Sequence, residues 1–367
     1  MSFDPERLAQ PAIRRLRAYD PGHDLPRLRT RFGAVLAELG SNENALGPSP
    51  AALEAAHAAL SETYRYPDPR CGALREALAQ QHGVTPDQLV FGNGSHELLM
   101  QLAQIFAGAD AAVMHAQFGF AVFPIAATAA GAPAVCVPAL PRTHPTAPLG
   151  HDLDAMADAL REDVRLIYLA NPNNPTGTWF THAALEAFLQ RVPRDTLVVV
   201  DEAYGEYMQA PGLDTAIALL DAHPNLIVTR SFSKAYALAG LRIGYLLAHA
   251  SVAAVLERLR ESFNINQVAQ AAARAALDDA AYLQSAIDIN AAERARMERT
   301  LSERGFATLP SQTNFLLLDL GEDAQVLEQR LFDQAVIVRP MGGYGLPHTL
   351  RVSVGSRAEN DRFLETL

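Results

Sequence analysis

One lysine stands out in the amino-acid sequence because of the residues around it. Residues 226–245 read LIVTRSFSKAYALAGLRIGY, where Lys234 is the single lysine among apolar side chains, small residues, hydroxyls and two arginines. A solvated loop normally carries more charge than this. Scarce water and nearby positive charge both lower the pKa of an amine, which then attacks carbonyl compounds more readily. Lys234 is therefore the first candidate for chemistry.

A glycine-rich turn follows an apolar run earlier in the chain. The segment GNGSHE carries Gly94, Ser95 and His96, and a helix that opens on the capping hydroxyl of Ser95 is predicted there. Glycines allow close backbone approach, and the N–H groups of a helix N-terminus bind phosphate. Taken alone, the segment is more typical of an ordinary turn and cap, and a solvated His96 needs no further role.

Further segments supply amide, carboxylate and phenol groups. NPNNPTG contains Asn174, and DEAYGEY places Asp201 at the end of an apolar run with Tyr204 three positions later. A carboxylate that ends a buried strand needs a partner, so in isolation Asp201 is better explained as a helix cap or ion-pair member. The remaining candidates offer hydroxyl or guanidinium donors close to Lys234, and they are Ser231, Ser233 and Arg242.

These groups together suit one kind of ligand. It would have a phosphate for the hydroxyls and the arginine, a ring nitrogen for the carboxylate, a phenolic oxygen for the tyrosine and asparagine, and an aldehyde for the amine. Pyridoxal 5′-phosphate has all four groups. The interpretation requires that segments far apart in the chain meet at one place.

Seven apolar runs of strand length, with helical segments between them, provide such a place. Continuous apolarity is typical of strands covered on both faces, as in a mostly parallel sheet between helical layers. Ligands bind beyond the carboxyl ends of such strands, which is where the polar segments stand. The runs lie at 89–94, 111–116, 134–139, 164–170, 197–204, 226–232 and 243–248.

The pattern changes after about residue 250. Long Ala- and Arg-rich helices continue to about residue 304, and TNFLLLDL, AVIVRP and TLRVSVG then read as short strands around a helix near 323–334. This indicates a smaller α+β domain, which the N-terminal residues join because they contain no strand run of their own. We therefore predict a large domain at 46–255 and a small domain formed by 1–45 and 256–367.

Composition excludes several classes of function. The 30 Lys and Arg against 41 Asp and Glu give a net charge of −11, and no basic run would follow a nucleic-acid backbone. Neither a signal peptide nor an apolar run of membrane-spanning length is recognisable. Cys71 and Cys136 lack disulfide or metal-ligand spacing, so we expect two buried thiols, no metal site and a cytoplasmic protein.

The motifs resemble those of fold type I aminotransferases, and within that group those of the histidinol-phosphate aminotransferases. The resemblance implies the α/β fold of pyridoxal-phosphate-dependent transferases (aspartate aminotransferase-like), with a mostly parallel seven-stranded sheet in the large domain and a smaller α+β domain. It also implies a homodimer with shared active sites, and an amino donor and a 2-oxo acid as substrates. The matching segments are NENALGPSP, YRYPD, GNGS, NPNNPTG, DEAYGEY, RSFSKAYALAGLRIGY, FNINQVAQAAA, TNFLLL and VIVRPMGGYGLPHTLRVSVG.

The resemblance assigns roles around the cofactor. Lys234 would bond to the cofactor aldehyde and later carry the proton between the substrate and the cofactor, while Asp201 would pair with the ring nitrogen. Asn174 and Tyr204 would hydrogen-bond the phenolic oxygen, and Phe118 would stack on the ring. The groups expected around the cofactor phosphate are Gly94, Ser95, His96, Ser231, Ser233 and Arg242.

Two further expectations concern the partner subunit and the substrate. Tyr66, in YRYPD, would reach the cofactor phosphate of the neighbouring subunit. Arg351 would bind the substrate carboxylate or phosphate because guanidinium groups suit planar anions; without the resemblance it is more typical of a structural ion pair. The implied substrate-binding set is Tyr19, Asn174, Arg339 and Arg351.

Four residues depart from the family pattern. His96 stands where an acidic residue or its amide is common, and Phe118 replaces a frequent tyrosine, which keeps stacking but removes a hydroxyl. His23 replaces a frequent lysine, so the charge at the substrate mouth would depend on pH. Ala237 replaces a common glycine and is expected to cost little.

The sequence leaves several functions open. An aminotransferase acting on histidinol phosphate leads, followed by an aromatic amino-acid aminotransferase and then by a decarboxylase of a phosphorylated amino acid, since the bond that breaks depends on geometry. A non-catalytic sensor would lack the lysine or carry a DNA-binding module. A nucleotide-binding dehydrogenase would show a full GxGxxG with a downstream acid.

Overall fold

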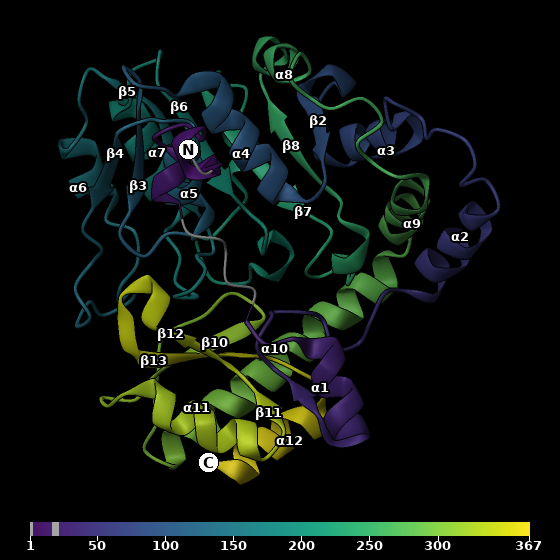
Figure 1. Cartoon of the computed structure of the whole chain (residues 1–367), viewed down its shortest axis with the longest axis vertical. Coiled ribbons are helices and arrows are strands. Elements are labelled where there is room, and N and C mark those ends of the chain that lie inside the picture. The colour runs from purple at the N-terminus through teal and green to yellow at the C-terminus, as the bar shows by residue number, and fades with distance from the viewer. Residues whose placement is uncertain (1–2, 17–21) are drawn as a thin grey trace.

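A seven-stranded sheet forms the centre of the larger part of the protein (Figure 1). The computed structural model describes residues 3–16 and 22–367. The strand order is β2-β8-β7-β6-β5-β3-β4, and neighbouring strands are parallel except where β8 pairs with β2 and β7. The predicted mostly parallel sheet is confirmed. Its strands are β2 (Leu89–Gly92), β3 (Ala112–Ala116), β4 (Ala134–Val137), β5 (Val164–Ala170), β6 (Leu197–Asp201), β7 (Leu226–Ser231) and β8 (Gly244–Ala248).

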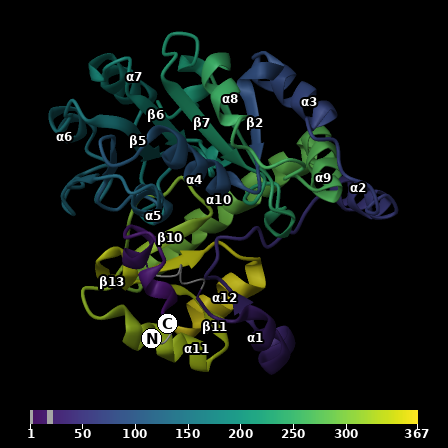
Figure 2. The ribbon, with the colours of Figure 1, turned by 45° about the horizontal axis from the view of Figure 1, so that its top comes forward.

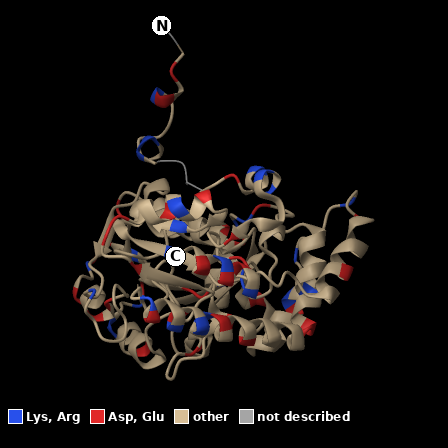
Figure 3. Ribbon diagram, turned by 90° about the horizontal axis from the view of Figure 1, so that it is seen from below, with Lys and Arg blue, Asp and Glu red and all other residues tan. Residues whose placement is uncertain are grey.

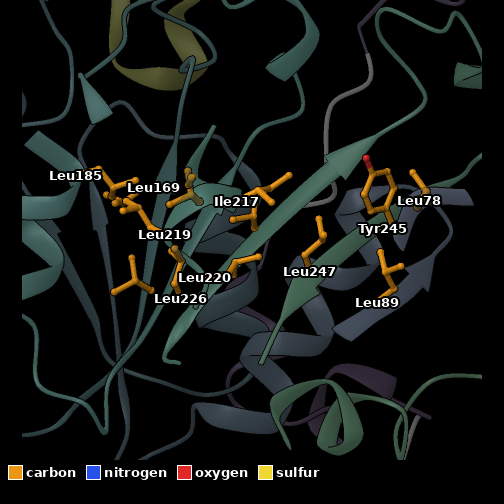
Figure 4. Close-up of a cluster of buried hydrophobic side chains, with 14 of the residues drawn as sticks. Leu78, Leu89, Leu169, Leu185, Ile217, Leu219, Leu220, Leu226, Tyr245 and Leu247 are labelled. Atoms are coloured by element: carbon orange, nitrogen blue, oxygen red, sulfur yellow. The ribbon is translucent and has the colours of Figure 1, made fainter. Parts of the chain in front are cut away.

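Helices cover both faces of this sheet. In β6, Val198 and Val200 belong to one hydrophobic cluster and Val199 to another, so successive side chains are buried on opposite faces. This explains the continuous apolar runs; Figure 4 shows side chains of the first cluster. The first cluster includes residues of α2 (Pro50–Leu60), α3 (Gly72–His82), α6 (Leu153–Asp158), α7 (His182–Arg191) and α9 (Gln267–Asp278), and the second those of α4 (Ser95–Phe106), α5 (Val122–Ala129) and α8 (Ala250–Leu256).

Three helices of this part begin in two different ways. The hydroxyls of Ser49 and Thr181 each accept a backbone N–H from the first turn of α2 and α7. Ser95, in contrast, is not a cap: Gly94 occupies the N-cap position of α4, with a φ of 78°, and Ser95 is the first helical residue. The glycine can adopt this backbone conformation without steric cost, which explains why the cap falls one residue earlier.

Strand β4 is an exception to the predicted burial. It lies at the edge of the sheet and pairs only with β3 within the described part of the chain, and three of its four residues are at least partly exposed. Cys136 is accordingly exposed, whereas Cys71 is buried. The expectation of two buried thiols was therefore wrong for Cys136, because an apolar run does not distinguish an edge strand from a central one.

A smaller sheet lies below the larger one in Figures 1 and 2, with the strand order β12-β13-β10-β9. The N-terminal strand β1 pairs in parallel with β11, so the two ends of the chain form one hydrophobic cluster with this sheet. The four strands of the smaller sheet are β9 (Ala307–Thr308), β10 (Phe315–Asp319), β12 (Arg339–Met341) and β13 (Leu346–Ser353). The separate pair is formed by β1 (Ala37–Glu38) and β11 (Val336–Ile337). The helices of this part are α1 (Leu25–Phe32), α10 (Ala280–Glu303), α11 (Ala324–Asp333) and α12 (Arg357–Thr366).

Helix α9 bears on the predicted division into domains. Its buried alanines, including Ala269 and Ala273, pack in the same cluster as Ala52 of α2 and the strands of the larger sheet. Helix α9, which the predicted small domain includes, thus packs against the larger sheet, and the division of the chain into 46–255 and the two flanking segments remains a prediction.

The charge distribution and the lengths of the helices bear on larger partners. On the face seen in Figure 3, basic and acidic residues are intermixed. Among the described residues, none of the helices has the length and apolar character needed to cross a lipid bilayer.

Candidate active site

A cavity of about 430 Å³ lies at the carboxyl ends of strands of the seven-stranded sheet. Its lining also includes Arg339 and Arg351 from β12 and β13, so the smaller sheet closes one side of it. Open α/β sheets bind ligands at this edge. The predicted residues that line it are Gly94, Ser95, His96, Asn174, Asp201, Tyr204, Ser231, Ser233, Lys234, Arg242, Arg339 and Arg351.

Lys234 follows β7 and is half-buried. Its Nζ atom donates a hydrogen bond to the main-chain oxygen of Asn42 over 3.2 Å and lies 5.6 Å from the centre of the Tyr204 ring. Burial, and next the positive charge of Arg351, lowers the pKa of Lys234 to about 8. The amine is therefore partly neutral at mildly alkaline pH, as a nucleophile for an aldehyde must be.

Asp201 is the last residue of β6, and only 4% of it is exposed. Its Oδ1 atom accepts a hydrogen bond of 2.8 Å from the hydroxyl of Thr229 on the neighbouring strand. Burial raises the pKa of Asp201 to about 6. A ring N–H⁺ beside this carboxylate would offset the cost of burying the charge, so the site suits a protonated pyridine nitrogen.

Tyr204 and Asn174 present their polar groups to the same cavity. The hydroxyl oxygen of Tyr204 accepts a hydrogen bond of 2.9 Å from Nδ2 of Asn42. Oδ1 of Asn174 accepts one of 2.7 Å from Nη1 of Arg351. Because its oxygen faces the guanidinium, the amide of Asn174 has its N–H groups available for an oxygen of a ligand.

Glycines and an arginine form a cradle next to the start of α4. A Cβ atom on Gly94 would come within 2.6 Å of Nη2 of Arg242, and one on Gly244 would come within 2.6 Å of the backbone N of Ser95. Nη1 of Arg242 is 3.5 Å from the hydroxyl of Ser233. Backbone N–H groups at a helix N-terminus, hydroxyls and one guanidinium are the donor set that a phosphate requires, so the residues fit this part of pyridoxal phosphate.

His96 also lines the cavity from the first turn of α4. Partial burial, followed by the charge of Arg242, lowers the pKa of its imidazole. A largely neutral His96 adds no positive charge to the cradle at neutral pH.

The phenylalanine in the cavity lining is Phe120, whereas Phe118 is not part of it. Phe118 packs in a neighbouring buried cluster with Leu149, Leu317 and Met341, so its stacking on the cofactor stays a prediction. Both phenylalanines follow β3 and flank Gly119. Alternation along the chain cannot decide which of them faces the cavity once the strand has ended.

Two predicted residues besides Phe118 lie outside the cavity lining or outside the described residues. Tyr66 is 81% exposed and stacks on Phe263, with 4.7 Å between ring centres. It is absent from the cavity lining of its own subunit, which leaves its expected role toward a partner as a prediction. Tyr19 lies outside the described residues.

A larger cavity of about 1110 Å³ shares Arg339 with the first one. His23 lines this larger cavity, where its Nε2 atom is 2.9 Å from Oε1 of Glu328 and its ring stacks on Phe332. The residue expected at the substrate mouth is thus paired with a carboxylate of α11.

Comparison with known proteins places this arrangement in a family. The family model described as aminotransferase class I and II matches residues 35–367. The chain belongs to this family. A histidinol-phosphate aminotransferase 2 of Pseudomonas aeruginosa is 45% identical over 98% of this chain and 96% of its own, and one of Methylococcus capsulatus is 43% identical over 98% and 97%.

Solved structures agree with the fold of the aminotransferase. The histidinol-phosphate aminotransferase of Sinorhizobium meliloti, crystallised with pyridoxal 5′-phosphate, has a TM-score of 0.88 and 35% identity over 97% of this chain and 95% of its own. The aspartate aminotransferase of Thermus thermophilus, at 23% identity and a TM-score of 0.82 over 98% of this chain and 99% of its own, shares the fold. The predicted fold class is confirmed.

Sequence reasoning missed three residues of the aminotransferase site. Neither Phe120 nor Thr229 is distinguished by residue type or spacing, and Asn42 lies in the segment NENALGPSP, to which the resemblance assigns no role. For Asn42 a signal was present, because an asparagine-rich segment outside any helix is typical of a residue in an unusual backbone conformation.

Proposed function

We propose that this aminotransferase uses pyridoxal 5′-phosphate to move an amino group from histidinol phosphate to 2-oxoglutarate, and that it also catalyses the transfer in the opposite direction. The observation that carries the proposal is the meeting of Lys234, Asp201 and the Asn174–Arg351 pair around one cavity. The names of relatives at 41–45% identity over 98% or more of this chain support the choice of amino donor.

Pyridoxal phosphate, when bound, supplies a protonated ring that withdraws electrons from the substrate α-carbon. Lys234 would hold the cofactor by its amine and, once released from it, would take and return the α-proton of the substrate. Asp201 keeps the ring nitrogen protonated. The phenol of Tyr204 and the amide of Asn174 donate to the ring oxygen and orient it.

Binding and water exclusion fall to other residues of the cavity. Gly94, Ser95, Ser231, Ser233 and Arg242 would hold the phosphate. Phe118 keeps its predicted stacking role, and Phe120 lines the cavity. Arg351 and Arg339 bind the anionic groups of the amino donor and the 2-oxo acid, since two adjacent guanidinium groups offer several donors to a carboxylate or a phosphate.

We extend the proposal to a homodimer in the cytoplasm. Tyr66 and Phe263 expose stacked rings at the surface, and exposed aromatic pairs are typical of subunit interfaces. Tyr66 would then complete the phosphate cradle of the neighbouring subunit. Light scattering should give twice the mass of the chain, and Tyr66→Phe should weaken cofactor binding; a monomer with full activity would refute this part.

Half-reactions test the cofactor and the amino donor separately. The purified protein should show a visible absorbance band that is lost in Lys234→Ala, and a colourless protein that binds no pyridoxal phosphate would refute the cofactor. Histidinol phosphate, phenylalanine, tyrosine and threonine phosphate are then added one at a time, and the conversion to the amine form is followed by absorbance. Histidinol phosphate should react fastest; equal or faster conversion with phenylalanine would overturn the proposed donor.

A further inference from the structure

Asn42 has an unusual number of contacts for a residue outside the predicted site. It is 2% exposed, follows β1 by four residues and lines the cavity together with Lys234 and Tyr204. Its side-chain Nδ2 donates to the hydroxyl of Tyr204 over 2.9 Å, and its main-chain oxygen accepts from Nζ of Lys234 over 3.2 Å. One residue therefore contacts both polar groups that face the reacting part of the substrate.

The remaining polar atoms of Asn42 are held by the smaller sheet. Its backbone N donates to the hydroxyl of Ser353 over 2.8 Å, and the same hydroxyl donates to its Oδ1 over 3.3 Å. Ser353 stands two residues after Arg351 on β13. The main-chain oxygen also accepts from Nδ2 of Asn314 over 3.0 Å. These hydrogen bonds thus hold Asn42 against β13, the strand that also carries Arg351.

The backbone of Asn42 is in the left-handed region, with a φ of 55°. Only glycine adopts this conformation freely, and asparagine and aspartate tolerate it better than other residues. Among these, only asparagine presents both an amide donor for Tyr204 and an acceptor for Ser353. The conformation aims the carbonyl at Lys234 while the side chain reaches the phenol.

The direction of the hydrogen bond to Tyr204 matters for the chemistry. Because Nδ2 of Asn42 donates, the phenol oxygen acts as acceptor in this contact, and its own hydrogen remains to be donated into the cavity. An acceptor at position 42 would instead compete for that hydrogen. Similarly, the carbonyl of Asn42 gives the amine of Lys234 a defined position whenever the amine is not bonded to a ligand.

From these contacts we infer that Asn42 is a positioning residue, which fixes the donor direction of Tyr204 and the position of the free Lys234 amine relative to Arg351. The inference rests on the proposed function for its kinetic part. It predicts that loss of the side chain lowers kcat more than it raises KM, because the affected groups act on the reacting atoms and not on the anion of the substrate.

Two substitutions at the same position separate the side chain from the backbone. Asn42→Gly keeps the left-handed backbone and removes the amide, whereas Asn42→Ala removes the amide and also strains the backbone that aims the carbonyl. We expect about a tenfold loss of kcat for glycine with KM changed less than about threefold, and a larger loss for alanine. Asn42→Asp, which turns the donor into an acceptor, should also shift the pH profile of kcat.

The matched control is Asn225→Ala. Asn225 is a buried asparagine that donates to the main-chain oxygen of Thr196, at the opposite end of β7 from Lys234. Its removal should lower the melting temperature without changing kcat or the pH profile. If Asn42→Gly behaves in the same way, Asn42 is merely structural and the inference is overturned.

A measurement on the cofactor-free protein tests the contact without turnover. Melting temperatures of Asn42→Gly, Tyr204→Phe and the double variant form a mutant cycle. If the amide and the phenol contact each other, the double variant should lose less melting temperature than the sum of the losses in the two single variants. Strict additivity would overturn the inference. An inactive wild-type protein with an intact mutant cycle would instead refute the proposed function and leave the contact standing.

Discussion

Arg339 of β12 and Arg351 of β13 stand directly opposite each other on antiparallel strands, and both line the cavity. Opposed residues on such strands project from the same face, where two like charges are unfavourable by several tenths of a kcal/mol. Proteins keep such a pair where an anion binds between or beside the two groups. The register of the small sheet thus supports our proposal that a carboxylate or phosphate of the substrate binds there.

Removing one member of this pair should weaken anion binding selectively. In cofactor-loaded protein, Arg339→Gln should raise KM for the phosphorylated amino donor by about 10- to 100-fold, the range for losing a hydrogen bond to a charged group. It should also reduce the rise in melting temperature that inorganic phosphate gives. Steady-state kinetics and calorimetry measure the two effects; an unchanged KM would exclude Arg339 from the substrate site.

Cofactor uptake should report the pKa of Lys234. Only the neutral amine attacks the aldehyde, so the rate at which cofactor-free protein gains visible absorbance should rise with pH around a midpoint near 8. Arg351 is the second cause of the lowered pKa after burial, so Arg351→Gln should move the midpoint upward. Arg357→Gln, which removes an exposed guanidinium paired with Glu293, is the control. Identical midpoints in all three proteins would contradict the coupling.

The cofactor-free protein should lose stability as Asp201 ionises. The pKa is about 6 when folded and 3.8 for the ordinary group, so the folded state binds more protons between these values and stability falls as pH rises through them. The penalty above pH 6 is about 3 kcal/mol. The free energy of unfolding of Asp201→Asn relative to wild type should therefore increase between pH 4 and pH 7, as denaturant titrations will measure. A difference that stays constant over this range would show that Asp201 has an ordinary pKa.

Gly94→Ala should damage the phosphate cradle. The added methyl group would press on Nη2 of Arg242, and the left-handed φ of 78° adds backbone strain. We expect the dissociation constant for pyridoxal phosphate, measured by fluorescence quenching, to rise about tenfold or more. Gly108→Ala, where a Cβ would meet no atom within 4 Å, should leave it unchanged. Equal affinities of the two variants would argue against the cradle.

Ala237→Gly should stabilise the protein. The sequence suggested that alanine costs little here, but its φ is 57°, a conformation in which a Cβ is unfavourable by about 1 kcal/mol. Thermal unfolding should show a higher melting temperature with the same absorbance band. A lower melting temperature would mean that the flexibility of glycine in the unfolded chain outweighs the relief of strain.

The strand framework could be predicted because its cause is local. β6 and the first half of β7 are apolar and buried, and each strand ends where a polar residue enters the cavity, so the pattern alone predicts the positions of Asp201 and of the residues before Lys234. The same pattern wrongly predicted burial for β4. Whether a strand lies at the edge of a sheet depends on the pairing of the whole sheet, which the strand's own residues do not reveal.

The contacts that complete the site could not be predicted, because they join distant parts of the chain. Nothing near Asn42 in the sequence indicates that Tyr204 accepts its hydrogen bond, and nothing near Thr229 indicates that its hydroxyl faces Asp201. Phe118 and Phe120 are equivalent by residue type, and the turn after β3 decides between them.

The bond between Asn42 and Ser353 joins residues 311 positions apart. A ribosome must therefore deliver almost the whole chain before the lysine acquires its surroundings, even though the central strands can associate earlier. A nascent or truncated chain that lacks β13 would keep the amine but not the guanidinium that lowers its pKa. Formation of β13 thus supplies the second of the causes, after burial, that lower the pKa of Lys234.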